Sequence, residues 1–157
     1  MLKEIENYLS FLNDFRNQVK TLLEGLPKEA LDWRPISGEG ELATNSLGVM
    51  ATHLTGSEAF WMKEIIGGQS IRRDRDAEFV VKGLGFAELL AKLEAAAKDT
   101  QEILSSLTPS QLEETRKFRD RIVMVRWAIL HVIEHFAMHI GHMQLTRQLW
   151  LSTFGKK

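Results

Sequence analysis

Apolar residues recur every three or four positions along most of the chain, which is the spacing of an amphipathic α-helix. Every long apolar pattern has this period, and no stretch is convincing as a strand. The pattern predicts four long helices, at about residues 2–26, 45–67 and 86–107 and from 122–125 to about 152. The sequence therefore predicts an all-α fold.

Four helices of this length, joined by long crossover-type connections, predict a four-helix bundle. A chain of 157 residues can bury one core and is too short to expect two, so we expect one domain over residues 1–157. Thr108, Pro109 and Gln111 form a capping-box start for an additional short helix. The connection at residues 67–85 is long and strongly charged, and we expect it to pack across an opening.

Composition excludes several classes of partner and chemistry. The net charge is −1 and the sequence has no basic stripe with interleaved aromatic residues, so we expect no nucleic-acid partner. The absence of cysteine excludes disulfides, thiolate ligands and a cysteine nucleophile, and it suits a cytoplasmic location. The first residues do not resemble a signal peptide, and no apolar run reaches the ~20 residues of a membrane span, so we expect no membrane association.

Four of the five histidines, His131, His135, His139 and His142, lie close together in the run HVIEHFAMHIGHMQ. On one helix they share a stripe roughly 80° wide. Two histidines spaced i, i+4 can bind one divalent ion, and both 131/135 and 135/139 have this spacing. The alternative is a solvated or pH-responsive histidine face. Four on one stripe favour metal binding, because each buried polar group without a partner costs about 1–3 kcal/mol.

His53 lies in the second predicted helix, within the apolar stretch LGVMATHLTGSEAFWMKEII. Because bundles build metal sites from side chains on facing helices, His53 is the candidate third ligand. Three histidines with an open fourth position are typical of a catalytic site. The chain lacks the repeated Glu-x-x-His pattern of di-iron bundles and the H-E-x-x-H pattern of zinc proteases. Imidazole ligands suit Zn, Ni or Fe, so the metal is predicted only as a divalent ion.

Three segments resemble the DinB-like family of metal-binding four-helix proteins, which includes the bacillithiol and mycothiol S-transferases. LPKEALDWRP at 26–35 is similar to the family's segment after its first helix. NSLGVMATHLTGSEAFW at 45–61 is similar to the motif of its second helix, and HVIEHFAMHIGH at 131–142 to the H-x-x-x-H motif of its last helix. The resemblance covers nearly the whole chain.

Carried over by position, the resemblance implies that His53, His135 and His139 are the metal ligands. His142 stands where many members have glutamine, and we take it as a candidate catalytic residue that handles a proton at the rim of the site. His131 is then a core or supporting residue. The resemblance also implies a homodimer, with a low-molecular-weight thiol and an electrophilic small molecule as the reactants.

A divalent ion held by three neutral imidazoles keeps its charge and can lower the pKa of a bound water or thiol. With the resemblance, this favours a metal-dependent thiol S-transferase. One alternative is a metal-dependent hydrolase with Glu134 or Glu58 as proton acceptor. Another is a non-catalytic metal-binding protein of stress response or regulation. An open metal position beside a pocket would favour an enzyme over a binding protein.

Arg72, Arg73 and Arg75 form a basic run in the connection between the second and third helices. Their guanidinium groups have the geometry to bind the carboxylates of an acidic thiol. We expect instead that Asp74 and Asp76 neutralise them within a solvated loop.

Overall fold

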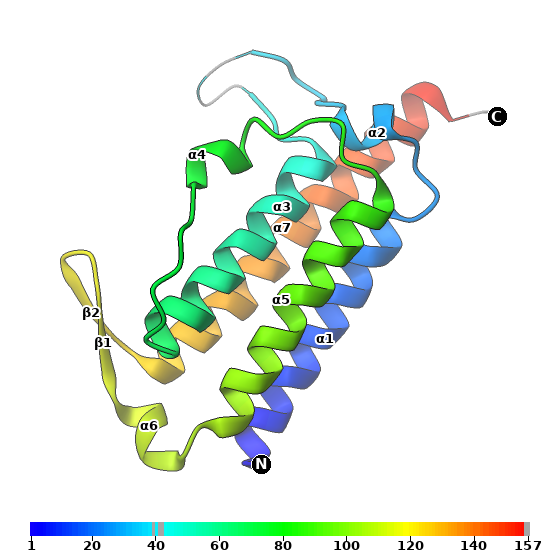
Figure 1. The fold of residues 1–157 in the computed structure, drawn as a ribbon. Coiled ribbons are helices and arrows are strands. Elements are labelled where there is room, and N and C mark those ends of the chain that lie inside the picture. The colour runs from blue at the N-terminus through cyan, green and yellow to red at the C-terminus, as the bar shows by residue number, and fades with distance from the viewer. Residues whose placement is uncertain (39, 41–42, 156–157) are drawn as a thin grey trace.

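Four long helices run side by side in the computed structural model, which describes residues 1–38, 40 and 43–155 (Figure 1). The predicted single domain, residues 1–157, thus includes five residues that lie outside the described ones. The all-α four-helix bundle is confirmed. The long helices are α1 (Lys3–Leu23), α3 (Leu47–Ala59) with its π-helical continuation η2 (Phe60–Ile66), α5 (Phe86–Ser106) and α7 (Val125–Phe154).

Local sequence signals set the ends of these helices. Ser46 caps α3, because its side chain accepts a hydrogen bond from the backbone N–H of Val49 at 3.2 Å. The predicted short helix is α6 (Pro109–Glu113), which begins with the expected capping box at Thr108. Two further short helices, α2 (Lys28–Asp32) and α4 (Arg75–Glu78), lie in the connections between the long helices.

The expectation of no strands is wrong. β1 (Thr115–Phe118) and β2 (Arg121–Met124) form an antiparallel hairpin immediately before α7. Each strand has four residues and most of their side chains are exposed, so no apolar alternation marks them in the sequence. Arg119 lies in the turn with a φ of 55°, in the left-handed region that glycine adopts most easily.

The core lies between the four long helices. α7 packs against α1 and α3, and α3 also packs against α5. Burying one aliphatic or aromatic side chain completely stabilises the fold by about 1.5–3 kcal/mol relative to leaving it exposed. The largest fully buried side chains come from all four helices and include Ile5, Leu12, Leu54, Leu89 and Phe136. Among the described helices, none is long and apolar enough to cross a membrane.

One ion pair lies inside this core and joins three helices. Arg16 of α1 donates to the carboxylate of Glu58 on α3, and the Thr100 hydroxyl of α5 donates to the same carboxylate at 2.6 Å. The side chain of Glu58 is fully buried and that of Arg16 is 8% exposed. The carboxylate is therefore held by these two donors and serves the packing of the bundle.

Candidate metal centre

Three histidines meet where α3 faces α7. His135 and His139 lie one turn apart on α7, and His53 approaches them from α3. The Nε2 atom of His135 lies 3.2 Å from that of His53 and 3.2 Å from that of His139. One ring nitrogen from each of the three residues lies within 4.8 Å of the other two. Two nitrogens that bind one tetrahedral ion at 2.0–2.1 Å are about 3.3 Å apart, so the spacing fits a shared ion.

The carboxylate of Glu78 sets the tautomer of His53. Its Oε2 accepts a hydrogen bond from Nδ1 of His53 at 2.9 Å, so Nε2 of that ring presents a lone pair to the cluster. Nε2 of His135 can then either donate its one hydrogen or accept one. Without an ion, it cannot make a full hydrogen bond to both neighbours. An ion at the centre satisfies all three lone pairs together, which supports the fit of this group to a metal.

Burial keeps the three imidazoles uncharged. Loss of hydration lowers the pKa of His53, although the Glu78 carboxylate opposes that shift. Burial, with the neighbouring histidines, lowers the pKa of His135 to about 3 and that of His139 to about 4. All three rings are therefore neutral near pH 7, the form in which imidazole binds metal.

We expect the metal-free protein to lose stability as the pH falls from 7 to 5. Histidines in the unfolded chain take up protons near pH 6.5, whereas His135 and His139 stay neutral in the folded protein until well below pH 5. The unfolded state is therefore favoured at the lower pH, by about 2–4 kcal/mol over this interval. Thermal melts of chelator-treated protein measure this change. In His135→Gln, the melting temperature should depend less steeply on pH. A melting temperature of the unchanged protein that is independent of pH would contradict the prediction.

Glu78 is a site residue that the sequence did not identify. It ends α4, and its buried carboxylate also accepts hydrogen bonds from Arg73 Nε at 2.7 Å and Nη2 at 2.9 Å. The expected neutralisation of Arg73 by Asp74 is wrong, because the Asp74 side chain caps α4 instead. Gly56 allows the close approach of Glu78 to α3, since a Cβ there would lie 2.2 Å from the carboxylate oxygen Oε1.

Replacing Glu78 with glutamine should weaken metal binding about 10–100-fold. The amide keeps the size of the side chain, but it lowers the basicity of His53 and leaves Arg73 without its charged partner. Titration against a competing chelator measures the affinity. Asp76→Asn is the matched control, since it removes an exposed carboxylate from the same short helix. Equal affinities for the two variants would contradict the role of Glu78.

The other two histidines flank the cluster along α7. His131 stacks on Trp127, with ring centroids 5.0 Å apart and planes 5° apart. His142 is exposed, and its ring centroid lies 5.7 Å from that of His139. The structure thus brings His53, His135 and His139 together and leaves His131 and His142 on either side. That His53, His135 and His139 bind metal, and that His142 handles a proton, stay predictions.

The two glutamates considered as proton acceptors do not join the cluster. The carboxylate of Glu58 is held by Arg16 and Thr100 inside the core. Glu134 is exposed, and its carboxylate lies 3.7 Å from Nδ1 of His131. Neither position supports the role of a base for hydrolysis at the three-histidine cluster.

Two cavities reach the histidine cluster from different sides, and both have volumes typical of small-molecule sites. The first, about 780 Å³, is the apolar pocket, lined by His139 and His142 with Trp33, Ile36, Met50, Leu145 and Leu149. The second, about 720 Å³, is the basic cleft, lined by His53, His131 and His135 with Arg73, Arg75, Lys117, Arg119 and Arg121. The cluster therefore borders both cavities.

Comparisons with known proteins agree with this fold. A model of the mycothiol S-transferase family matches residues 7–150. No curated protein matches the chain. Three solved structures have a similar fold. A conserved protein from Enterococcus faecalis is 14% identical with a TM-score of 0.76, and the match covers 97% of this chain and 99% of that one.

Two DinB-like proteins give similar results. The one from Bacillus subtilis is 20% identical with a TM-score of 0.67, and the match covers 90% of each chain. The one from Bacillus cereus is 17% identical with a TM-score of 0.72, covering 91% of this chain and 90% of that one. At these identities the likeness concerns the fold alone.

Proposed function

The chain belongs to the DinB-like mycothiol S-transferase family, and from this membership and the histidine cluster we propose that it is a metal-dependent thiol S-transferase. The reaction would move a low-molecular-weight thiol onto an electrophilic small molecule. The observation that carries the proposal is a group of three neutral imidazoles that faces two cavities. A closed structural site would leave no room for a reactant.

His53, His135 and His139 would hold one divalent ion, Zn, Ni or Fe, through ring nitrogens. When bound, the ion would supply a Lewis acid that lowers the pKa of a thiol enough for its anion to form near neutral pH. The thiol must come from outside, because the chain has no cysteine. Glu78 would keep His53 in the tautomer that binds, and Arg73 would keep Glu78 in place.

His142 is the proposed proton acceptor. It lines the apolar pocket together with His139, and it is exposed enough to pass a proton to solvent. In the reaction, His142 would take the proton of the thiol, the sulfur would form a bond to carbon of the electrophile, and the leaving group would depart with its electron pair. The apolar wall of Trp33, Leu145 and Leu149 would exclude water from this exchange.

The test begins with protein purified without a histidine tag. We expect about one divalent ion per chain, turnover of a generic electrophile with at least one thiol of a panel, and loss of turnover after chelation. In cobalt-substituted protein, the active thiol should produce a new near-ultraviolet absorption band. Fully loaded protein that shows neither turnover nor a spectral change with any cellular thiol would favour the non-catalytic alternative.

Replacing His142 with glutamine should leave metal content unchanged and lower the rate of transfer about 100-fold, which is within the usual contribution of a general base. The amide has no basic nitrogen, so the rate should rise with pH as the thiol ionises on its own. Metal analysis and a pH profile of kcat measure the two effects. Loss of metal in this variant would instead make His142 a ligand.

We also propose a homodimer in the cytoplasm, on the family resemblance and the absence of cysteine. Analytical ultracentrifugation of the full chain tests the dimer, and a monomer at micromolar concentration would contradict it.

A further inference from the structure

We propose that the basic cleft binds the anionic group, a carboxylate or a phosphate, of one of the two reactants and so holds that reactant beside His53 and His135. The inference rests on the proposed function for the identity of the site, and it adds the charge of a substrate. It starts from the hairpin β1–β2, which the sequence did not predict.

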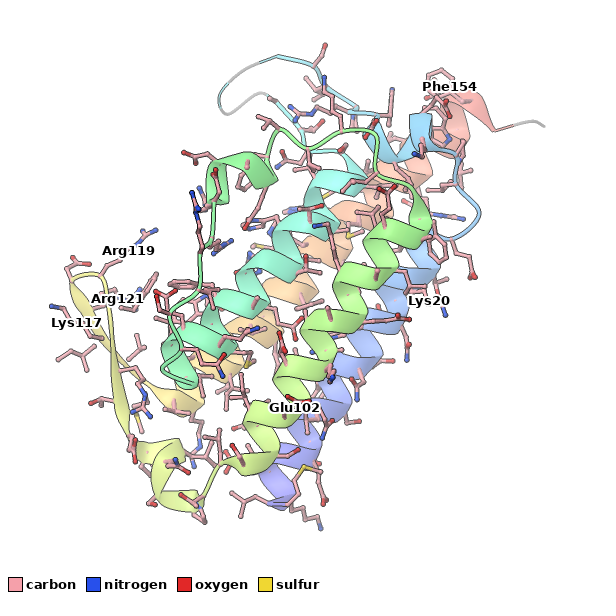
Figure 2. The ribbon with its side chains drawn as sticks, viewed as in Figure 1. Lys20, Glu102, Lys117, Arg119, Arg121 and Phe154 are labelled. Carbon is pink, nitrogen blue, oxygen red and sulfur yellow. The ribbon has the colours of Figure 1, made fainter. Side chains whose placement is uncertain are left out.

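Cations from two separate segments line the basic cleft. Lys117, Arg119 and Arg121 project from the hairpin (Figure 2), and Arg75 comes from α4. In the described part of the chain, Glu64 is the one acidic residue among the lining residues. Because the whole chain has a net charge of −1, this excess of positive charge is local. A cleft lined by one sign of charge raises the local concentration of oppositely charged ligands.

Aromatic rings hold the guanidinium groups in position. Arg75 lies over Phe79 at 4.9 Å from the ring centroid, Arg119 over Phe118 at 5.2 Å, and Arg121 over Trp127 at 5.2 Å. Stacking uses the face of a guanidinium and leaves its in-plane N–H groups available to a carboxylate or phosphate. Less side-chain entropy is then lost on binding.

The ion pairs of this region involve other residues. Arg73 pairs with Glu78, and Arg116 pairs with Glu114. Arg73 also lies over the Phe60 ring at 5.6 Å from the centroid, but its guanidinium is already paired with a carboxylate. Arg73 therefore serves the histidine cluster, whereas Arg75, Lys117, Arg119 and Arg121 are the groups that we assign to the ligand.

The backbone of the hairpin turn gives an independent reason. Arg119 has a φ of 55°, a conformation that costs an L-residue energy and that glycine adopts without strain. A strained arginine that lines a cavity indicates that its side chain is needed there. The cleft, at about 720 Å³, has the size of a small-molecule site, and it shares His53 and His135 with the cluster. A small anion therefore fits it better than a nucleic acid.

The first experiment measures binding without turnover. Metal-free full-length protein is titrated with N-acetyl-S-methylcysteine, which carries one carboxylate, and with its neutral amide. Tryptophan fluorescence is the readout, since Trp61 and Trp127 line the cleft. We expect the carboxylate to bind about tenfold more tightly than the amide, as one charge-assisted contact would give. Equal affinities, or a short oligonucleotide that displaces the anion at lower concentration, would overturn the proposal.

Variants locate the binding. Lys117→Gln, Arg119→Gly and Arg121→Gln together should remove the preference for the carboxylate, and Arg119→Gly alone should weaken anion binding while it preserves or raises the melting temperature. Lys20→Gln on α1 is the matched control, since Lys20 lies across the bundle from the hairpin (Figure 2). A triple variant that still folds and still prefers the anion would overturn the assignment to this cleft.

The second experiment finds which reactant is the anion. Metal-loaded protein is assayed with N-acetylcysteine against its amide, and with 4-chloro-3,5-dinitrobenzoate against its methyl ester. In the triple variant kcat/KM should fall about tenfold for one acidic member alone, which identifies the thiol or the electrophile. Equal effects on acidic and neutral members would contradict the proposal. Anion binding to the metal-free protein without any turnover would support this inference while the proposed S-transferase function fails.

Discussion

Replacing His135 with alanine is expected to abolish stoichiometric metal binding. His135 is the central member of the cluster, since its Nε2 atom lies 3.2 Å from Nε2 of both His53 and His139. Without His135, only the nitrogens of His53 on α3 and His139 on α7 remain, and the nitrogen that lay between them is missing. The loss should exceed the 10–100-fold cost of losing a supporting partner. Metal analysis of dialysed protein measures the stoichiometry.

His131→Ala is the matched control, because it removes an imidazole one turn earlier on the same helix, outside the cluster. This variant should retain one ion per chain. The double variant His53→Ala, His139→Ala tests the same three-histidine assignment by removing the other two ligands. If that protein still binds one ion tightly, the three-histidine assignment is wrong and the flanking histidines must supply ligands.

Replacing Arg16 with methionine should lower the free energy of unfolding by about 3–5 kcal/mol. The carboxylate of Glu58 is fully buried, and Arg16 is its charged partner. Without Arg16, the Glu58 carboxylate must either stay charged in the core or take up a proton. Only the hydrogen bond from the Thr100 hydroxyl then remains to it. Urea denaturation followed by circular dichroism measures the loss, and at this chain length the melting temperature should fall by about 10 °C.

Arg16→Met combined with Glu58→Met should recover much of this stability, because a matched apolar pair leaves no buried charge. Lys63→Met is the comparison at the surface. Lys63 and Asp99 form an ion pair with about a third of each side chain exposed, and its loss should cost less than about 1 kcal/mol. A similar cost for Arg16→Met and Lys63→Met would mean that Glu58 is not held as a buried ion pair.

Sequence periodicity predicted the long helices well, because each buries one face over many turns. α5 begins at the predicted residue, and α7 begins within the predicted interval. The hairpin was missed for a physical reason. Its strands bury little, and the run from Arg116 to Arg121 has a charged composition that reads as a loop.

The histidines could be found because they share one helix face, which is a property of sequence spacing. Glu78 could not, since it lies in a different, short helix, 25 positions from His53 in sequence. One signal was present. Gly56 follows His53 by three residues and leaves the same face of α3 without a side chain, which allows another group to approach. Nothing in the sequence says that this group is Glu78.

The basic cleft shows the same limit. Arg75 and the hairpin cations are more than 40 residues apart in sequence, and the packing of the hairpin on η2 and α7 and of α4 on α3 brings them to one cavity. The net charge is a sum over the whole chain, so it could not reveal that positive charge gathers at one cavity. The sequence RKFRDR at 116–121 contains part of this cleft, but Arg75 joins it only through the fold.

Three polar contacts to residues distant in sequence help to hold the segment at residues 69–85 to the rest of the protein. They are Glu78 to His53, the Arg34 side chain to the carbonyl of Phe79 at 2.9 Å, and the backbone N–H of Gly83 to the carboxylate of Asp32. Such a segment opens locally at a lower free-energy cost than global unfolding. Each opening breaks the hydrogen bond between Glu78 and Nδ1 of His53, so whatever holds these two residues together also slows amide hydrogen exchange in this segment. A metal ion held by His53, as proposed, would therefore be coupled to the local dynamics of this segment.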